Sequence, residues 1–153
     1  MKYLLHHPVS FILAAISVLT VTGCASGSAD KKVPELANEM CDCFSGFQQT
    51  LSPAGKDLMK AVSVSSTPQE EMISGMSKMK PDEAAAFAKQ VSSIADRNTE
   101  LFKCLEAFDK KHGKETTRDK KALTEKLLSE MQGNTNCPTG AAVINMNLAK
   151  MKK

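Results

Sequence analysis

Apolar residues recur at steps of three and four along most of the chain, which is the pattern of amphipathic helices. Pro34 suits a first helical position, and the apolar positions that follow it are Leu36, Ala37, Met40, Cys41, Phe44 and Phe47. Ser52-Pro53 predicts a second, short helix that runs to about Val64. Thr67-Pro68-Gln69-Glu70 has the form of a capping box and predicts a third helix that stops before Pro81.

The longest apolar seam begins after Pro81. It steps by four and three in alternation and is interrupted only by Asn98, with apolar residues at Phe87, Val91, Ile94, Leu101, Leu105 and Phe108. Acidic residues at its start and lysines at its end match the helix dipole. The seam therefore predicts one helix over about 81–112, roughly 45 Å long at 1.5 Å per residue, as the central element.

Two more helices complete the pattern. Thr116 or Thr117 is expected to cap a fifth helix that ends at Gly133, and Cys137-Pro138 starts a sixth. No segment combines strict alternation with β-branched residues, so we expect no sheet. The predicted fold class is all-α: a small bundle of five to six helices around the 81–112 helix, forming a single helical domain over residues 33–153.

Composition narrows the function classes. The chain has 20 basic and 17 acidic side chains, no tryptophan and one tyrosine. This near balance of charge argues against nucleic acid as a partner. With no tryptophan, and with Tyr3 at the extreme N-terminus as its one tyrosine, the chain is a poor candidate for a carbohydrate-binding surface.

The N-terminus has the layout of an export signal. Lys2 precedes an apolar run from Val9 to Val21, which is too short to span a bilayer comfortably. An uncleaved membrane anchor is the alternative, because the run lengthens if Tyr3 to Leu5 are counted with it.

The residues that close this run, Val21-Thr22-Gly23-Cys24, resemble the lipobox of bacterial lipoproteins. The resemblance implies that residues 1–23 are cleaved as a lipoprotein signal peptide and that Cys24 is lipidated. Several acyl chains together give a stable membrane anchor. Ala25 stands where an aspartate often retains such proteins in the inner membrane, so the implied location is the outer membrane, facing the periplasm or the cell surface. Residues 24–32 are small and polar, and we expect them to form a lipidated flexible tether.

Four further cysteines are Cys41, Cys43, Cys104 and Cys137. An even number in an exported chain predicts two disulfides. Residues two apart on a helix point about 200° apart, so Cys41 and Cys43 cannot bond to each other. Two pairings stay open: Cys41–Cys104 with Cys43–Cys137, or Cys41–Cys137 with Cys43–Cys104.

Candidate chemistry beyond the cysteines is sparse. Met72, Met76 and Met79 share one face of the third helix, where thioethers could hold Cu(I) but more simply fill the core. His112 follows two lysines at the end of the 81–112 helix, where we expect it to be solvated. The chain has no phosphate loop and no Gly-x-Ser-x-Gly, His-Glu-x-x-His or Cys-x-x-Cys motif.

These observations lead to two function hypotheses. The first is a non-enzymatic envelope lipoprotein that needs no cofactor and binds or supports a protein partner through a helical, Met-containing face. The second is a periplasmic copper-binding protein that uses Met72, Met76 and Met79, with reduced Cys41 or Cys43 as a further candidate ligand.

Overall fold

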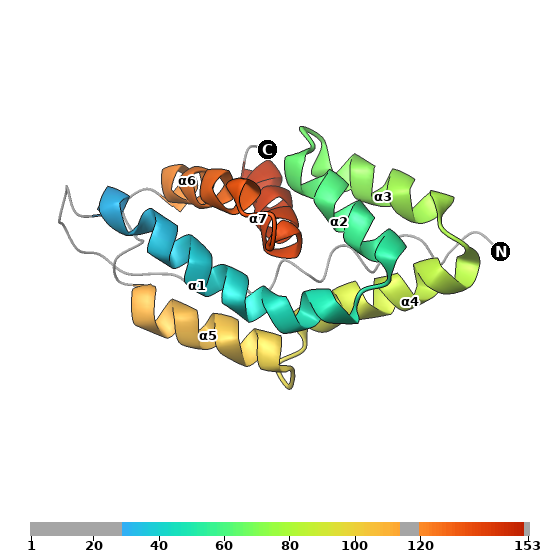
Figure 1. The fold of residues 1–153 in the computed structure, drawn as a ribbon, viewed down its shortest axis with the longest axis horizontal. Helices are drawn as coiled ribbons and strands as arrows, with labels where there is room; N and C mark the ends of the chain where they lie inside the picture. The colour runs from blue at the N-terminus through green and yellow to red at the C-terminus, as the bar shows by residue number, and fades with distance from the viewer. Residues whose placement is uncertain (1–28, 114–119, 152–153) are drawn as a thin grey trace.

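A computed structural model describes residues 29–113 and 120–151 of the chain, and Figure 1 shows its fold. The described residues form an all-α, disulfide-linked bundle, as predicted, and they contain no strand. The helices in chain order are α1 (Ala29–Thr50), α2 (Pro53–Val64), α3 (Pro68–Lys78), α4 (Pro81–Ser92), the 3₁₀ turn η2 (Ser93–Ala95), α5 (Glu100–His112), α6 (Lys120–Gly133) and α7 (Pro138–Met151).

Helix α1 begins earlier than predicted. It starts at Ala29, so Pro34 lies inside the helix and residues 29–32 are helical where a tether was expected. Alanine is the strongest helix former, and lysine also has a good intrinsic helix propensity, so the composition of residues 29–32 is compatible with a helix. These local preferences outweigh the polar, aperiodic appearance that suggested a flexible segment.

The predicted start of α2 is confirmed in detail. Ser52 is its N-cap, and the Ser52 hydroxyl accepts a hydrogen bond of 3.1 Å from the Gly55 amide. Helix α3 begins at Pro68 as predicted, but the Thr67 side chain makes no capping hydrogen bond. The pattern therefore located the start of α3 correctly, whereas the capping geometry expected there was wrong.

The prediction of one long helix over 81–112 is wrong. The chain leaves the helix after η2, passes through a turn at Asp96–Asn98 and starts α5 at Glu100. The Asp96 carboxylate accepts a hydrogen bond of 2.9 Å from the Asn98 amide, and the Thr99 hydroxyl accepts one of 3.2 Å from the Phe102 amide. Such local side-chain bonds compete with helical ones, so this segment prefers a turn and a new N-cap.

The central element is α7 rather than the 81–112 segment. Its residues from Thr139 to Leu148 are all buried, so the helix is covered on every side. It packs closely against α2 and α6 and also touches α1 and α3, as its place in the middle of Figure 1 shows. No charged residue occurs between Cys137 and Lys150, which is the composition of a fully buried helix.

The buried apolar side chains form two clusters. The first cluster lies among α1 to α5 and one face of α7, and includes Phe44, Met59, Met72 and Phe87. The second lies among α1, α6 and α7. Helix α5 is different from the others, since Leu101 is its only buried residue and α1 is the helix that it packs against most closely. No helix in the described part of the chain is long and apolar enough to cross a membrane.

Candidate functional site

One turn of α1 carries two cysteines that point to opposite sides of the helix. Cys41 pairs with Cys137 at the start of α7, with the Cα atoms 5.4 Å apart. Cys43 pairs with Cys104 in the middle of α5, with the Cα atoms 5.6 Å apart. The two disulfides are as predicted, and of the two open pairings the structure has Cys41–Cys137 with Cys43–Cys104. A single turn of α1 thus holds both α5 and α7.

The two disulfides differ in their surroundings. Cys41 is buried and Cys137 is completely inaccessible to solvent, within the second cluster. Cys43 is 8% exposed, whereas its partner Cys104 is an exposed residue. The first bridge is therefore a core feature, and the second lies at the surface.

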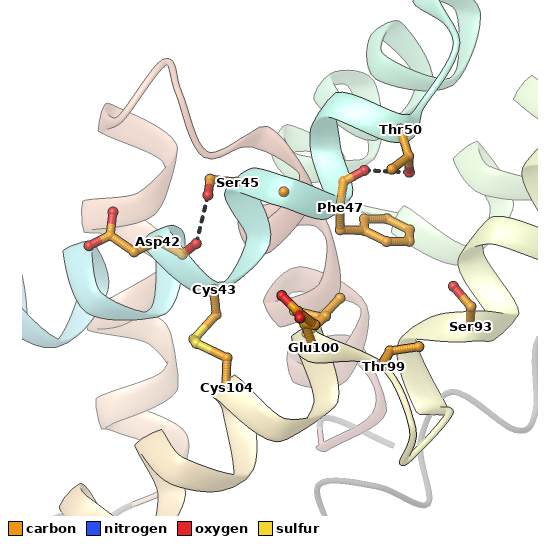
Figure 2. A pocket seen from close by; sticks show the side chains of 11 residues that line it. Asp42, Cys43, Ser45, Phe47, Thr50, Ser93, Thr99, Glu100 and Cys104 are labelled. Atoms are coloured by element: carbon orange, nitrogen blue, oxygen red, sulfur yellow. Dashed lines mark hydrogen bonds between the residues drawn. A yellow bond between two sulfur atoms is a disulfide. The ribbon is translucent and has the colours of Figure 1, made fainter.

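Helices α1 and α5 run antiparallel, and their contacts define the region around the exposed disulfide. Glu39 on α1 faces the end of α5 at Lys111 and His112, and Cys43 meets Cys104 about two turns earlier on α5. An open groove of about 430 Å³ follows this pair of helices beyond the disulfide. Figure 2 shows the disulfide bridging the two helices at this groove.

The groove has a mixed lining. Phe47 and Leu101 supply apolar surface, and Asp42 and Glu100 supply two carboxylates. The remaining lining residues are small or hydroxylated and include Ser45, Gly46, Thr50, Ser93 and Thr99. The Ser45 and Thr50 hydroxyls donate to carbonyls within α1, at 2.8 and 2.7 Å (Figure 2). None of these residues stands with a base and a nucleophile in the arrangement that general acid–base catalysis needs.

An ion cluster lies at the other end of the α1–α5 pair. Lys111 Nζ donates to Glu39 at 2.9 Å, and His112 Nε2 lies 2.9 Å from the second oxygen of the same carboxylate. The His112 ring also contacts the Phe108 ring, with centroids 4.9 Å apart. The expectation of a solvated histidine is thus wrong, because the side chain is only 14% exposed and packs between Phe108 and Glu39.

The electrostatics of this cluster act mainly on the acid. The hydrogen bond from Lys111, followed by that from His112, holds the pKa of the Glu39 carboxyl below its usual 4.5, and the slight burial of the group opposes this. The carboxylate is therefore the favoured form of Glu39 in the folded protein. Its long-range partners had no signature in the sequence, where Glu39 appears as one of several surface acids.

The methionine face of α3 is chiefly core. Met72 is buried, and Met76 and Met79 are partly buried against the first cluster. Two other apolar residues of the α2–α3 hairpin, Ile73 and Val64, are instead 57% and 69% exposed. Ile73 and Met76 are neighbours on the helix surface, being three residues apart.

The cysteines proposed as copper ligands are not free thiols. All four described cysteines are in disulfides, so none of them is a thiolate ligand. In residues 29–113 and 120–151, no three His, Cys, Asp or Glu side chains gather in a way that could hold a metal ion. The predicted lipidation site, Cys24, and the predicted caps at Thr116 and Thr117 lie outside the described residues.

No protein-family model, no curated protein and no solved structure matches this chain.

Proposed function

We propose that this protein is a lipid-anchored, non-enzymatic lipoprotein of the cell envelope that binds a protein partner through its α2–α3 hairpin. The observation that carries the binding proposal is the exposure of Ile73 and Val64 on that hairpin. Exposed aliphatic side chains beside a methionine are typical of helical surfaces that bind protein partners.

Support for the anchor comes from the sequence. The apolar run that ends in Val21-Thr22-Gly23-Cys24 supplies the signal and the acylated cysteine. The polar residues Ala25 to Ser28 would then separate the lipid from α1, which begins at Ala29. The outer membrane is the proposed location, because position 25 is an alanine and not the aspartate that often retains lipoproteins in the inner membrane.

Support for a binding role comes from the arrangement of the helices. The α2–α3 hairpin lies on one side of the molecule, whereas α5 lies on the far side of α1 (Figure 1). Two of the described large apolar side chains that remain exposed are on this hairpin. A partner that covers Ile73 and Val64 would remove that apolar surface from water, which is favourable at about 25 cal/mol per Å².

The anchor is tested by mass spectrometry of the protein isolated from membranes. We expect the chain to begin at Cys24 and to carry three acyl groups, and a Cys24→Ser variant to keep its leader. Recovery of a chain that still begins at Met1 without lipid would contradict the anchor and leave the binding proposal standing.

The binding face is tested by photocrosslinking in intact cells. A photoreactive residue at position 73 should capture a discrete protein, whereas the same residue at Glu125, an exposed position on α6, should not. An Ile73→Lys variant should fold normally, since the side chain is largely exposed, and should lose the captured partner. Equal capture from positions 73 and 125 would contradict the assignment of the face.

A further inference from the structure

We infer that the Cys43–Cys104 disulfide is a thiol-exchange site, at which an external thiolate attacks Cys104 Sγ through the α1–α5 groove while Cys41–Cys137 stays closed. The inference is independent of the binding face on α2–α3. It rests on the different surroundings of the two bridges that leave the same turn of α1.

Access to the sulfur decides which bridge can react. Thiol–disulfide exchange requires the attacking thiolate to reach one sulfur of the bond. Cys41 is 7% exposed and Cys137 is fully buried, so both sulfurs of that bridge are shielded by the second cluster. Cys104 is exposed, and both Cys43 and Cys104 line the groove.

The same difference in exposure identifies the sulfur that is attacked. Cys43 is 8% exposed and lies against the first cluster, whereas Cys104 is on the outer helix. An incoming thiolate therefore bonds to Cys104 Sγ, and the bond to Cys43 Sγ breaks. The electron pair of that bond leaves with Cys43 as a thiolate, which then takes a proton from water.

The first step leaves a mixed disulfide on Cys104 and a free thiol at Cys43. A second thiol can attack the incoming sulfur and release Cys104 as a thiol. In total, two external thiols are oxidised to one disulfide, and the protein disulfide is reduced to two thiols. The external thiol is either a small molecule or the dithiol of an oxidoreductase, since the chemistry at Cys104 is the same for both.

Opening this bridge would act mainly on α5. That helix buries only Leu101 and packs chiefly against α1. After exchange, the Glu39 contacts with Lys111 and His112 and the burial of Leu101 still join α5 to α1. With the cross-link open, α5 is held against α1 by noncovalent contacts alone. Helix α7 remains cross-linked to α1 through Cys41–Cys137.

The test uses the processed full chain in detergent, with glutathione as the probe. After acid quenching and alkylation, cleavage after lysines and before aspartates separates Cys41 from Cys43, because Asp42 lies between them. We expect glutathione on Cys104 and the alkyl group on Cys43, with Cys41–Cys137 still joined. Cys43 should become alkylated at least about tenfold faster than Cys41.

A matched pair of glycine variants tests the route of attack. A Cβ on Gly46 meets nothing within 4 Å, and a side chain there would lean over the preceding turn, toward Cys43. Gly46→Gln should slow the appearance of glutathione on Cys104 by about threefold or more, through lost access. Gly133→Gln, at an equally open position on α6, should leave the rate unchanged.

Four outcomes would overturn the inference. These are the opening of Cys41–Cys137 first or at the same rate, glutathione attached to Cys43, no exchange at either bridge, and equal rates in the Gly46→Gln and Gly133→Gln variants. A second arm distinguishes the source of the thiol. A thioredoxin-type protein with its resolving cysteine replaced by serine should be trapped on Cys104 if an oxidoreductase is the donor, whereas reaction with glutathione alone indicates a small thiol.

Discussion

Asn145 in the middle of α7 donates a hydrogen bond of 2.9 Å from its side-chain amide to the carbonyl of Val62, near the end of α2. The same amide nitrogen lies 2.8 Å from the Ser65 carbonyl. The last carbonyls of a helix lack intrahelical partners, so a buried side chain of α7 satisfies the C-terminus of α2. Asn145 thereby fixes the position of α2 on α7.

Removing this amide should be costly. We expect Asn145→Ala to lower the free energy of unfolding by about 1–3 kcal/mol, because the carbonyls at the C-terminus of α2 lose their buried side-chain donor. Chemical denaturation followed by circular dichroism measures the change. Asn38→Ala, at an exposed position on α1, is the control and should change stability little. A neutral Asn145→Ala would contradict the role assigned to this amide.

A second buried polar group should have the opposite effect. The Thr139 hydroxyl is fully buried and has no hydrogen-bond partner among the described residues. Thr139→Val keeps the shape and removes the unpaired hydroxyl, so it should raise the free energy of unfolding by about 1 kcal/mol. Thr99→Val removes the N-cap of α5 and should therefore lower the free energy of unfolding by about 1 kcal/mol. Melting temperatures that shift in the same direction for both variants would contradict this account.

The Glu39 cluster should make stability depend on pH. Because the pKa of Glu39 is lowered in the folded protein, the carboxylate stabilises the fold above its unfolded pKa of about 4.5, and this contribution is lost as the pH falls through the folded value. Glu39→Gln should therefore melt at a lower temperature than the native chain at neutral pH.

The difference between the two proteins should shrink as the pH falls below the unfolded pKa, because the native carboxyl then becomes protonated as well. Melting temperatures across this range give the test. Glu106→Gln is the control, since Glu106 pairs only with the exposed Lys110 on its own helix, at 3.4 Å. A pH-independent difference between Glu39→Gln and the native chain would show that the carboxylate charge is not the cause.

A glycine allows α2 and α3 to pack closely. A Cβ on Gly75 would lie 2.2 Å from Leu58 Cδ1, and the Leu58 side chain is buried. Gly75→Ala should lower the free energy of unfolding by about 1–3 kcal/mol through overpacking. Gly46→Ala, where a Cβ meets open space, should instead raise it by up to about 1 kcal/mol through helix propensity.

A double-mutant cycle identifies the cause. Gly75→Ala should cost less stability in a Leu58→Ala background than in the native chain, because the atoms that clash are then absent. The two substitutions should thus be non-additive in a double-mutant cycle. Simple additivity would mean that the contact between positions 58 and 75 is not the origin of the loss.

Helix positions were largely predictable from the sequence because their starts depend on local chemistry. Pro53, Pro68, Pro81 and Pro138 each begin a helix where the pattern placed one. The break between α4 and α5 was missed, since the apolar spacing continues across it in register. Asn98 was the visible signal, and its meaning depended on the turn formed by Asp96 and on the N-cap at Thr99.

The features that depend on long-range packing were harder to predict from the sequence. The set of bonded cysteines was predicted correctly, but choosing between two pairings required knowing which of α5 and α7 lies on each side of α1. The central place of α7 had a signal in its lack of charge between Cys137 and Lys150, although helix length pointed to the 81–112 segment instead. The contact of Glu39 with Lys111 and His112 joins residues more than seventy positions apart and leaves no local pattern.

The two sulfur bridges are nested along the chain, with Cys43–Cys104 inside Cys41–Cys137. A protease that cuts one peptide bond anywhere between Cys43 and Cys137 therefore leaves the fragments covalently joined. Such a cut would be invisible on a gel run without reductant and would separate the fragments only after reduction. The outer bridge, Cys41–Cys137, thus keeps the chain covalently in one piece after a single cut over most of its helical part.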